Sequence, residues 1–223
     1  MVQHSYIRSL TNGHQYLLLS HTIPSEFHRS SILDITDPTA TGAYWSNITA
    51  GALAVEYTTA GLNITYPGGG YAFESLTNDS FSVLHTRQID PTLSFDITFH
   101  TSSPIILNGG LGSLTLGVTK GQMPNMTTEW SMPSGVTFGS FHWNGTTHEI
   151  DTANSFTWYD RQWGGDVPKN WTWFGLHVGS PNDERKTTKV SLWAIDQTDN
   201  LLPRTQFATI RKEDGSQLVV PVV

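Results

Sequence analysis

The sequence predicts an all-β protein whose antiparallel strands form a barrel or a sandwich. Short apolar or alternating runs are separated by turn residues at spacings of about 8–12 residues, which is typical of such folds. Aromatic residues make up 11% of the chain, and the 20 Gly and 11 Pro residues favour strands and turns over helices. No segment combines a sustained helical period with capping residues.

The clearest strand covers residues 93–100, where Leu, Phe, Ile and Phe alternate with polar residues. Such alternation places apolar side chains on one face of a strand and polar side chains on the other. Further strands are predicted at residues 15–21, 31–35, 53–57, 62–66, 81–85, 129–132, 136–143, 148–150, 156–164, 171–178, 189–196, 207–211 and 217–222.

Turn signals separate these strands. Asn144-Gly145 is a strong signal for a two-residue hairpin turn, and Thr36-Asp37-Pro38 also favours a turn. The glycine-rich residues 108–112 are not followed by a helical pattern, so they predict a plain loop and not a phosphate-binding loop.

Charge and hydropathy exclude several kinds of partner. The net charge is −7 with only 12 Lys and Arg residues, so no basic surface for nucleic acid is expected. No apolar run reaches the roughly 18 residues of a transmembrane helix, so no membrane span is expected. The chain has no cysteine and therefore no disulfide.

Asn-x-Ser/Thr sequons are more frequent than chance predicts. Each is an acceptor for N-linked sugar on a surface loop or strand. We therefore expect a secreted glycoprotein. The first residues lack the charged and apolar regions of a signal peptide, which indicates a mature or truncated chain. The sequons lie at Asn47, Asn63, Asn78, Asn125, Asn144 and Asn170.

Residues 156–165 carry the most unusual pattern in a chain that is only 14% charged. This stretch contains an acid and a base among aromatic residues. In an extended strand, successive side chains point to opposite faces. One face then holds Trp158, Asp160 and Gln162, and the other holds Tyr159, Arg161 and Trp163.

Asp160 is the candidate catalytic residue. Burial against apolar rings raises the pKa of a carboxyl group, by up to ~3–5 units when it is complete, so that it can act as a general acid. Indole faces stabilise a developing cation by roughly 0.5–2 kcal/mol per good contact. These properties suit protonation of a carbon–carbon double bond. The alternative is a core strand in which Asp160 and Arg161 form a structural pair.

The pattern of residues 171–178 predicts a second strand that lines the ligand pocket. Trp171, Trp173, Gly175 and His177 share one face of this strand. Aromatic rings with one ionisable contact suit a pocket for an apolar ligand. The alternative is a core histidine whose ring is satisfied by a backbone carbonyl.

Other chemistries lack their motifs. The histidines do not form a His-x-His or His-Glu-x-x-His pattern, so no metal is expected. No Gly-x-Ser-x-Gly elbow is present for acyl transfer. Asp160 with Glu149 or Asp151 could form a glycosidase pair, but spacing alone does not determine the separation of these carboxyl groups.

The sequence resembles the carotenoid 1,2-hydratase and AttH-like superfamily, in particular its fungal secreted branch similar to kievitone hydratase and to Diels-Alderases. The resemblance rests on Ser-Phe-Thr-Trp-Tyr-Asp-Arg-Gln-Trp-Gly at residues 155–164, and extends over nearly the whole chain. Two further segments support it by their order and spacing. They are Ser-Ser-Ile-Leu-Asp-Ile-Thr-Asp-Pro at residues 30–38 and Trp-Thr-Trp-Phe-Gly-Leu-His at residues 171–177.

The resemblance implies lipocalin-like β-domains in tandem, with residues 1–205 forming the first domain and residues 206–223 beginning a second, truncated one. Asp160 matches the family acid, and Trp130 matches a family Trp. Trp158 stands where the carotenoid enzymes have Tyr, and Thr128 where they have His. These departures favour the fungal branch over carotenoid hydration.

Together these observations predict a cofactor-free hydratase that adds water to a prenyl or terpenoid double bond. The alternatives are a pericyclase of the Diels-Alderase type in fungal secondary metabolism and a non-catalytic, lipocalin-like binder of apolar metabolites. Asp160 is the expected acid, and the expected substrate-binding residues are Trp158, Trp130, Tyr159, Gln162, Trp163, Trp171, Trp173 and His177.

The sequons make a direct prediction about the protein secreted by a eukaryotic host. Enzymatic removal of N-linked sugar should lower its mass, because each occupied sequon carries a bulky glycan. Mass spectrometry before and after deglycosylation measures this. An unchanged mass would refute the prediction.

Overall fold

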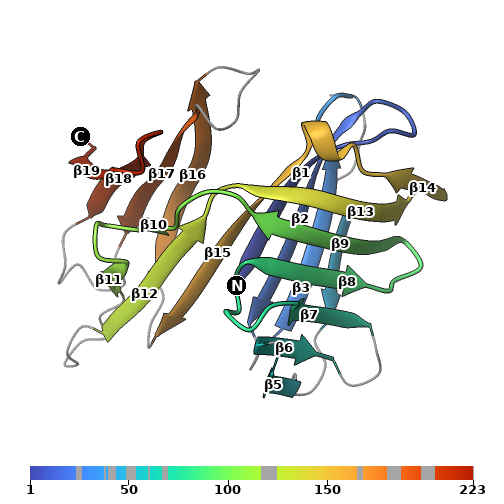
Figure 1. Ribbon diagram of the computed structural model, residues 1–223, viewed down its shortest axis with the longest axis horizontal. Coiled ribbons are helices and arrows are strands. Elements are labelled where there is room, and N and C mark those ends of the chain that lie inside the picture. Colours follow the sequence, from blue (N-terminus) through green and yellow to red (C-terminus); the bar gives the residue numbers. More distant parts are fainter. Residues whose placement is uncertain are drawn as a thin grey trace. The chain divides into compact units, whose positions relative to one another are not determined.

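In the computed structural model, the described residues are 1–23, 27–37, 39, 44–48, 54–59, 61–66, 70–116, 125–164, 168–179, 187–196 and 204–222. They form strands almost throughout, which confirms the all-β prediction (Figure 1). Their one helical element is the 3-10 turn η1 (Thr152–Asn154), whose first turn is capped by the carboxylate of Asp151. No helix in the described ranges is long and apolar enough to cross a membrane.

The chain divides into two compact units. Unit 1 comprises Met1–Ser102 and Ser134–Tyr159, and unit 2 comprises Ser103–Pro133 and Asp160–Val223. One strand, β15 (Phe156–Gly164), belongs to both, because the division falls between Tyr159 and Asp160. The predicted division at residues 205 and 206 stays a prediction.

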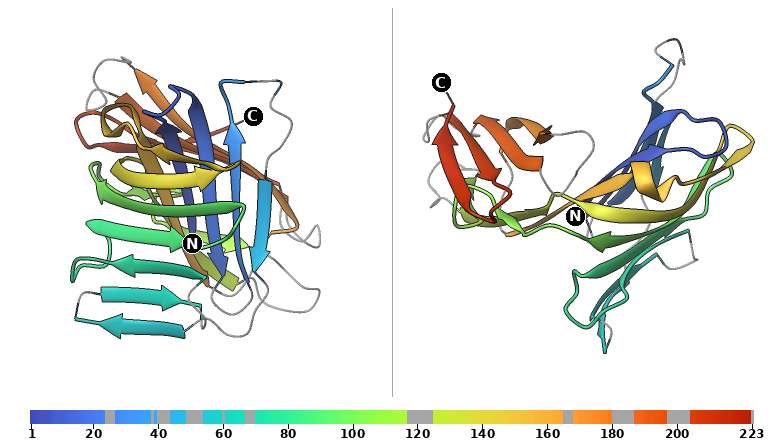
Figure 2. Two further views of the ribbon diagram at one scale, coloured as in Figure 1. Left: turned by 90° about the vertical axis from the view of Figure 1, so that its right-hand side faces the viewer. Right: turned by 45° about the horizontal axis from the view of Figure 1, so that its top comes forward.

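Unit 1 is a curled antiparallel sheet (Figures 1 and 2). Its strands follow the order β4-β3-β2-β1-β15-β13-β9-β8-β7-β6-β5, with β14 paired to β13. The strands are β1 (Val2–Arg8), β2 (Gln15–Ile23), β3 (Phe27–Asp34), β4 (Tyr44–Ile48), β5 (Ala54–Thr58), β6 (Gly61–Thr65), β7 (Tyr71–Ser75), β8 (Val83–Gln88), β9 (Leu93–Thr101), β13 (Gly135–Trp143) and β14 (Thr146–Glu149).

Alternation along these strands builds the core of unit 1. In β9 every second side chain is buried, as the sequence predicts, and Leu93, Ile97 and Phe99 are fully enclosed. The Asn144-Gly145 turn also has its predicted form, with both residues at positive φ and with Trp143 opposite Thr146. Local pattern therefore suffices for the strongly alternating strands and for this hairpin.

Polar groups also lie inside unit 1, where they are hydrogen-bonded. The imidazole of His28 contacts Thr22 Oγ1 at 3.0 Å and Gln88 Oε1 at 2.9 Å, and its ring stacks on Tyr71 with centroids 3.6 Å apart. Burial lowers the pKa of His28 to about 4, so the ring is neutral near neutral pH. Buried polar side chains of this kind are stable because they have partners.

Unit 2 contains a four-stranded antiparallel sheet in the order β16-β17-β18-β19 (Figure 1). Its strands are β16 (Asn170–Gly179), β17 (Thr187–Asp196), β18 (Thr205–Arg211) and β19 (Gln217–Pro221). The unit also contains β10 (Ile106–Leu107), β11 (Ser113–Leu116) and β12 (Asn125–Met132), and β12 pairs with β10, β11 and β15. The glycine-rich residues 108–112 form the loop between β10 and β11, as predicted.

The core of unit 2 joins these two groups of strands. Leu116 of β11 packs with Trp193 and Ile195 of β17 and with Phe207 of β18. Trp173 of β16 packs against the same cluster from a partly buried position. The inner face of the four-stranded sheet therefore faces β11, and the residues on that face enter the interior of unit 2.

At Gly139, strand β13 lies very close to the backbone of β9. Its φ is +117°, and a Cβ atom there would lie 2.0 Å from the Asp96 carbonyl oxygen. We predict that Gly139→Ala lowers the free energy of unfolding by about 3 kcal/mol or more, because backbone strain and overlap add. Gly13→Ala is the control: its φ is +77° but no atom lies within 4 Å, so only about 1–2 kcal/mol is expected. Urea denaturation of both variants measures the difference, and equal losses would contradict the close approach.

Candidate functional site

Two carboxyl groups are buried in unit 2 on paired strands. Asp160, the predicted acid, lies in β15 with 5% of its surface exposed, and Glu129 lies in β12 with 2% exposed. The two strands are hydrogen-bonded neighbours. Buried carboxyl groups are uncommon in proteins, and they gather at functional sites. Glu129 and Asp160 therefore define the candidate site.

Two contacts indicate how β12 and β15 are aligned. Gly164 lies against Thr127, since a Cβ atom built on Gly164 would come within 2.7 Å of the Thr127 Cα atom. Three residues earlier on β15, Arg161 lies over the ring of Trp130, which is three residues later on β12. The strands therefore run antiparallel, and the residues bearing the buried carboxyl groups are diagonal neighbours on one face, about 7–8 Å apart.

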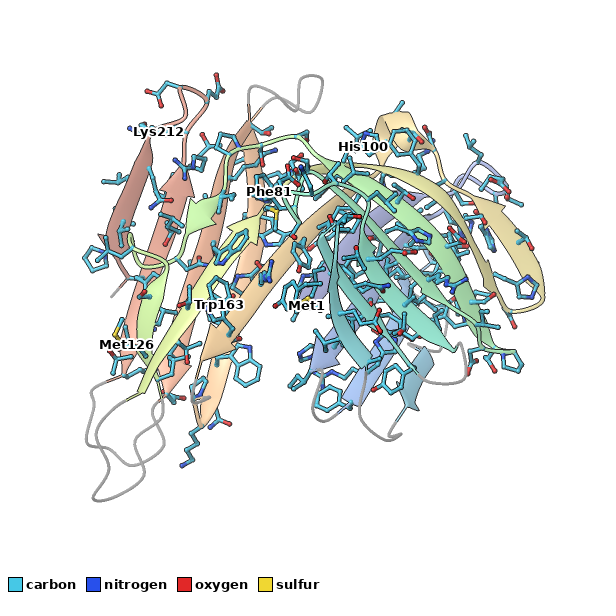
Figure 3. The ribbon with its side chains drawn as sticks, turned by 60° about the horizontal axis from the view of Figure 1, so that its bottom comes forward. Met1, Phe81, His100, Met126, Trp163 and Lys212 are labelled. Atoms are coloured by element: carbon cyan, nitrogen blue, oxygen red, sulfur yellow. The ribbon has the colours of Figure 1, made fainter. Side chains whose placement is uncertain are left out.

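The opposite face of this strand pair is aromatic and cationic. The Arg161 guanidinium lies 5.7 Å from the ring centroid of Trp130 and 5.7 Å from that of Trp163. The two indoles meet edge to face, with centroids 5.6 Å apart. Figure 3 labels Trp163 on β15, whose side chain is half exposed. The structure thus groups Trp130 and Trp163 with Arg161, on the face away from Asp160.

It is electrostatically unfavourable for both carboxyl groups of the pair to be ionised at the same time. Burial raises the pKa of Glu129 well above its usual range, and the charge of Asp160 raises it further. Each ionised carboxylate would lose its hydration inside unit 2, and the two would repel each other. A proton on one member of the pair removes the repulsion and leaves only one buried charge without its hydration.

A buried amide and a hydroxyl lie next to Glu129. Asn108 is fully buried, its backbone N–H donates to the Glu129 carbonyl at 3.3 Å, and its side-chain Nδ2 donates to Ser131 Oγ at 3.1 Å. Its Oδ1 atom is buried without a hydrogen-bond partner among the described residues. Burying an amide oxygen without a hydrogen-bond donor costs free energy, so this atom is suited to accept a hydrogen bond from a water or a ligand hydroxyl.

The four-stranded sheet contributes Trp173 to the interior of unit 2. Its indole Nε1 donates to Ser191 Oγ at 3.1 Å, and the same oxygen accepts from Trp193 Nε1 at 3.1 Å. The two indole rings lie 6.2 Å apart. Trp173 is thus fixed by a hydrogen bond and by core packing. Trp171, at the start of β16, is half exposed.

His177 has the backbone partner that the alternative interpretation anticipated. Its Nε2–H donates to the Pro133 carbonyl at 2.7 Å, and its Nδ1 lies 3.2 Å from the Nζ of Lys189, which can donate to it. Burial, followed by the charge of Lys189, lowers the pKa of His177 to about 4. Both ring nitrogens are engaged within the protein, so the histidine organises the interior of unit 2.

The remaining predicted site residues fall in different places. Trp158 and Tyr159 are buried in unit 1, where the Tyr159 ring stacks on Phe73 with centroids 5.3 Å apart. Gln162 is partly buried in the unit 2 part of β15. The two candidate glycosidase partners both belong to unit 1. Glu149 is exposed on β14, and the Asp151 carboxylate caps η1.

The sequons differ in exposure. Asn78, Asn144 and Asn170 have exposed side chains, as a glycan requires, whereas Asn63 is partly buried. The side chains of Asn47 and Asn125 lie outside the described residues.

Sequence reasoning missed Glu129 as a site residue. A signal was present: Glu129 begins a predicted strand and stands beside Trp130, in a chain with few charged residues. The pattern did not say which face of that strand is buried, or that the strand lies beside residues 156–164. Only the pairing of β12 with β15 brings the two carboxyl groups together.

Comparison with known proteins identifies relatives with a similar sequence and fold. No protein-family model matches the chain. The dehydratase asqC of Emericella nidulans is 34% identical over 96% of this chain and 59% of its own length. Kievitone hydratase of Fusarium solani subsp. phaseoli is 35% identical over 98% of this chain and 58% of its own length. The chain thus spans 58–59% of the length of these curated relatives.

Solved structures agree with the sequence matches. The crystal structure of kievitone hydratase from Nectria haematococca superimposes with a TM-score of 0.79 and 31% identity, covering 99% of this chain and 63% of that one. An AttH-like protein from Nitrosomonas europaea has a TM-score of 0.67 and 16% identity, covering 99% of this chain and 67% of that one, and supports the fold alone.

The chain therefore has a lipocalin-like β-structure, a fold that it shares with the solved kievitone hydratase and with the AttH-like protein. The chain is similar in sequence to kievitone hydratase and to the dehydratase asqC, and in fold to kievitone hydratase, which confirms the resemblance found in the sequence.

His177 makes a prediction about acid stability. Its pKa in the folded protein, about 4, lies below the ordinary value of 6.5. Between these values the unfolded chain binds a proton that the folded protein does not, so His177 costs stability as the pH falls from 6.5 to 4. We predict that His177→Gln flattens this loss by up to about 1.4 kcal/mol per pH unit. Urea denaturation across this pH range measures it. Parallel pH profiles for the two proteins would show that His177 is not held neutral.

Proposed function

We propose that this chain is part of a hydro-lyase, an enzyme that adds water to a carbon–carbon double bond or removes it. Two relatives are named as a hydratase and a dehydratase, which run the same chemistry in opposite directions. Hydration leaves the oxidation state of the substrate unchanged overall, so the proposal requires no redox cofactor. The observation that carries it is the buried Asp160 beside Glu129 in unit 2.

The proposed reaction begins with Asp160 as a general acid. Its carboxyl group gives a proton to the less substituted carbon of the double bond, and the positive charge develops on the more substituted carbon. Water then adds to that carbon. Acid catalysis by a positioned side chain contributes typically about 10²–10⁴-fold to a rate, and it requires a carboxyl group that is shielded from bulk water. Asp160, at 5% exposure, meets that requirement.

The proposed substrate class is a small apolar molecule with a prenyl or terpenoid double bond. A more substituted alkene carbon carries the cationic charge best, and aromatic side chains lower its energy further. Trp173 is the indole that the inner face of the four-stranded sheet presents within unit 2. Among the relatives, one is named for kievitone, and that name supports a small molecule as substrate.

Secretion and glycosylation belong to the same proposal. The exposed sequons at Asn78, Asn144 and Asn170 could each carry a glycan without disturbing the core. A secreted enzyme would meet an apolar metabolite outside the cell. The deglycosylation experiment described above tests this part separately.

Asp160→Asn tests the acid role. We predict a loss of about 10²–10⁴-fold in kcat for hydration of a prenylated phenol, with KM little changed, because the isosteric amide keeps the shape but holds no transferable proton. Product formation is followed by mass spectrometry, since water addition raises the substrate mass. The control is Asp196→Asn, a carboxylate that is 49% exposed and 3.2 Å from Arg204 Nε. It should retain wild-type turnover.

Three outcomes would contradict the proposal. Unchanged turnover in Asp160→Asn would rule out the acid role. A wild-type protein that returns its bound ligand chemically unaltered would be a binder. A product with rearranged rings and no added mass would indicate a pericyclase.

A further inference from the structure

We propose that Glu129 is the second catalytic carboxyl group: it shares a single proton with Asp160 and takes the proton of the water that adds to the substrate. This inference rests on the proposed hydro-lyase function and adds a residue that the sequence analysis did not assign.

The geometry of unit 2 supports the pair. Glu129 and Asp160 are diagonal neighbours on hydrogen-bonded antiparallel strands, and both are at least 95% buried. The other face of these strands is occupied by Arg161 between its indoles, so that guanidinium is directed away from the carboxyl pair. Arg161, the basic residue of β15, is therefore not directed at the two carboxyl groups.

The opposing sheet supplies a limited positive charge. Its titratable groups on the inner face are His177, Lys189 and Arg211, which stand in one cross-strand row. His177 is neutral because its pKa is about 4. The Arg211 guanidinium donates to the carbonyls of Ile105 and Gly215 at the other end of that row.

Lys189 is the buried cation of this row, at 4% exposure. A buried cation favours a carboxylate near it, and the N-terminal ammonium of Met1 lowers the pKa of Glu129. Burial and the charge on Asp160 act in the opposite direction and outweigh it, so the pKa of Glu129 is well above its usual range. The resting pair therefore carries one negative charge and one proton, and Glu129 holds that proton.

The shared proton gives a balanced catalytic cycle. Glu129 first passes its proton to Asp160, which leaves Glu129 ionised. Asp160 then protonates the alkene carbon, and the π electron pair forms the new C–H bond. Water attacks the cationic carbon and its O–H bond breaks, with the proton going to Glu129. The pair returns to its resting state, with Asp160 ionised and Glu129 protonated, and no other reactant is consumed.

The same cycle in reverse removes water. Glu129 then protonates the departing hydroxyl, and Asp160 takes a proton from the neighbouring carbon. One pair of carboxyl groups therefore serves a hydratase and a dehydratase alike, and these are the two activities for which the relatives are named.

Asn108 provides a hydrogen-bonding site for the attacking water. Its backbone is hydrogen-bonded to the Glu129 carbonyl, and its buried Oδ1 has no hydrogen-bond partner among the described residues. A water that donates one hydrogen to Asn108 Oδ1 would keep its second hydrogen for Glu129. This arrangement satisfies the amide oxygen and orients the water for deprotonation.

The first experiment measures turnover. Glu129→Gln should lower kcat by about 10²–10⁴-fold, and the double variant Glu129→Gln with Asp160→Asn should lose little more, because residues that act as a unit are not additive. Glu149→Gln changes an exposed carboxyl group of unit 1 and should behave as wild type. Circular dichroism checks that each variant is folded.

The second experiment needs no substrate. Infrared spectroscopy should detect the C=O stretching band of a protonated carboxyl group near neutral pH in the wild type, and this band should be absent in Glu129→Gln. In Asp160→Asn the band should titrate at lower pH, because a neutral amide no longer repels the Glu129 charge. This last comparison remains valid even if Glu129→Gln does not fold.

The outcomes separate this inference from the proposed function. An active wild type with a fully active Glu129→Gln variant, or with no protonated carboxyl band, overturns the role of Glu129 and leaves the hydro-lyase in place. A wild type that shows the band but hydrates no alkene overturns the hydro-lyase and leaves the shared proton. Loss of both band and turnover in Glu129→Gln supports the inference.

Discussion

Repulsion between two carboxyl groups that share a buried interior governs the chemistry of unit 2. Asp160 and Glu129 lie on neighbouring strands with almost no access to water, so two charges there would be neither hydrated nor fully neutralised. The surrounding groups are arranged accordingly. Lys189 provides one buried cation, and His177 stays neutral because burial and the charge of Lys189 lower its pKa. The transferable proton that we propose follows from this balance.

The two faces of β15 separate opposite charges along one strand. Arg161 is adjacent to Asp160 in sequence, yet it lies between Trp130 and Trp163 on the other face. Cation–π contacts of this kind stabilise a guanidinium without any carboxylate. If Arg161 paired with Asp160 instead, its charge would lower the pKa of that carboxyl group and oppose the transfer of a proton to it. The two tryptophans thus hold the Arg161 guanidinium on the face away from Asp160.

Local pattern predicted much of the fold. Strict alternation in residues 93–100 predicted the half-buried strand β9, and Asn144-Gly145 predicted the hairpin between β13 and β14. Strands β1, β4, β7, β10 and β11 were missed, because short or polar segments become strands through their neighbours and not through their own periodicity. The motif also did not indicate that the Tyr159 ring stacks on Phe73 in the core of unit 1, and a ligand contact of Tyr159 stays a prediction.

The sequence by itself was enough to predict an all-β chain and its relatives and to single out Asp160 as the candidate acid, because alternation, turn residues and a distinctive aromatic motif are local properties. Only the tertiary structure showed that Glu129 stands beside Asp160 and that both ring nitrogens of His177 are engaged within the protein. These facts depend on which strands pair and which faces they bury. Strand pairing between residues about 30 positions apart is decided by the packing of the whole unit, and no local pattern records it.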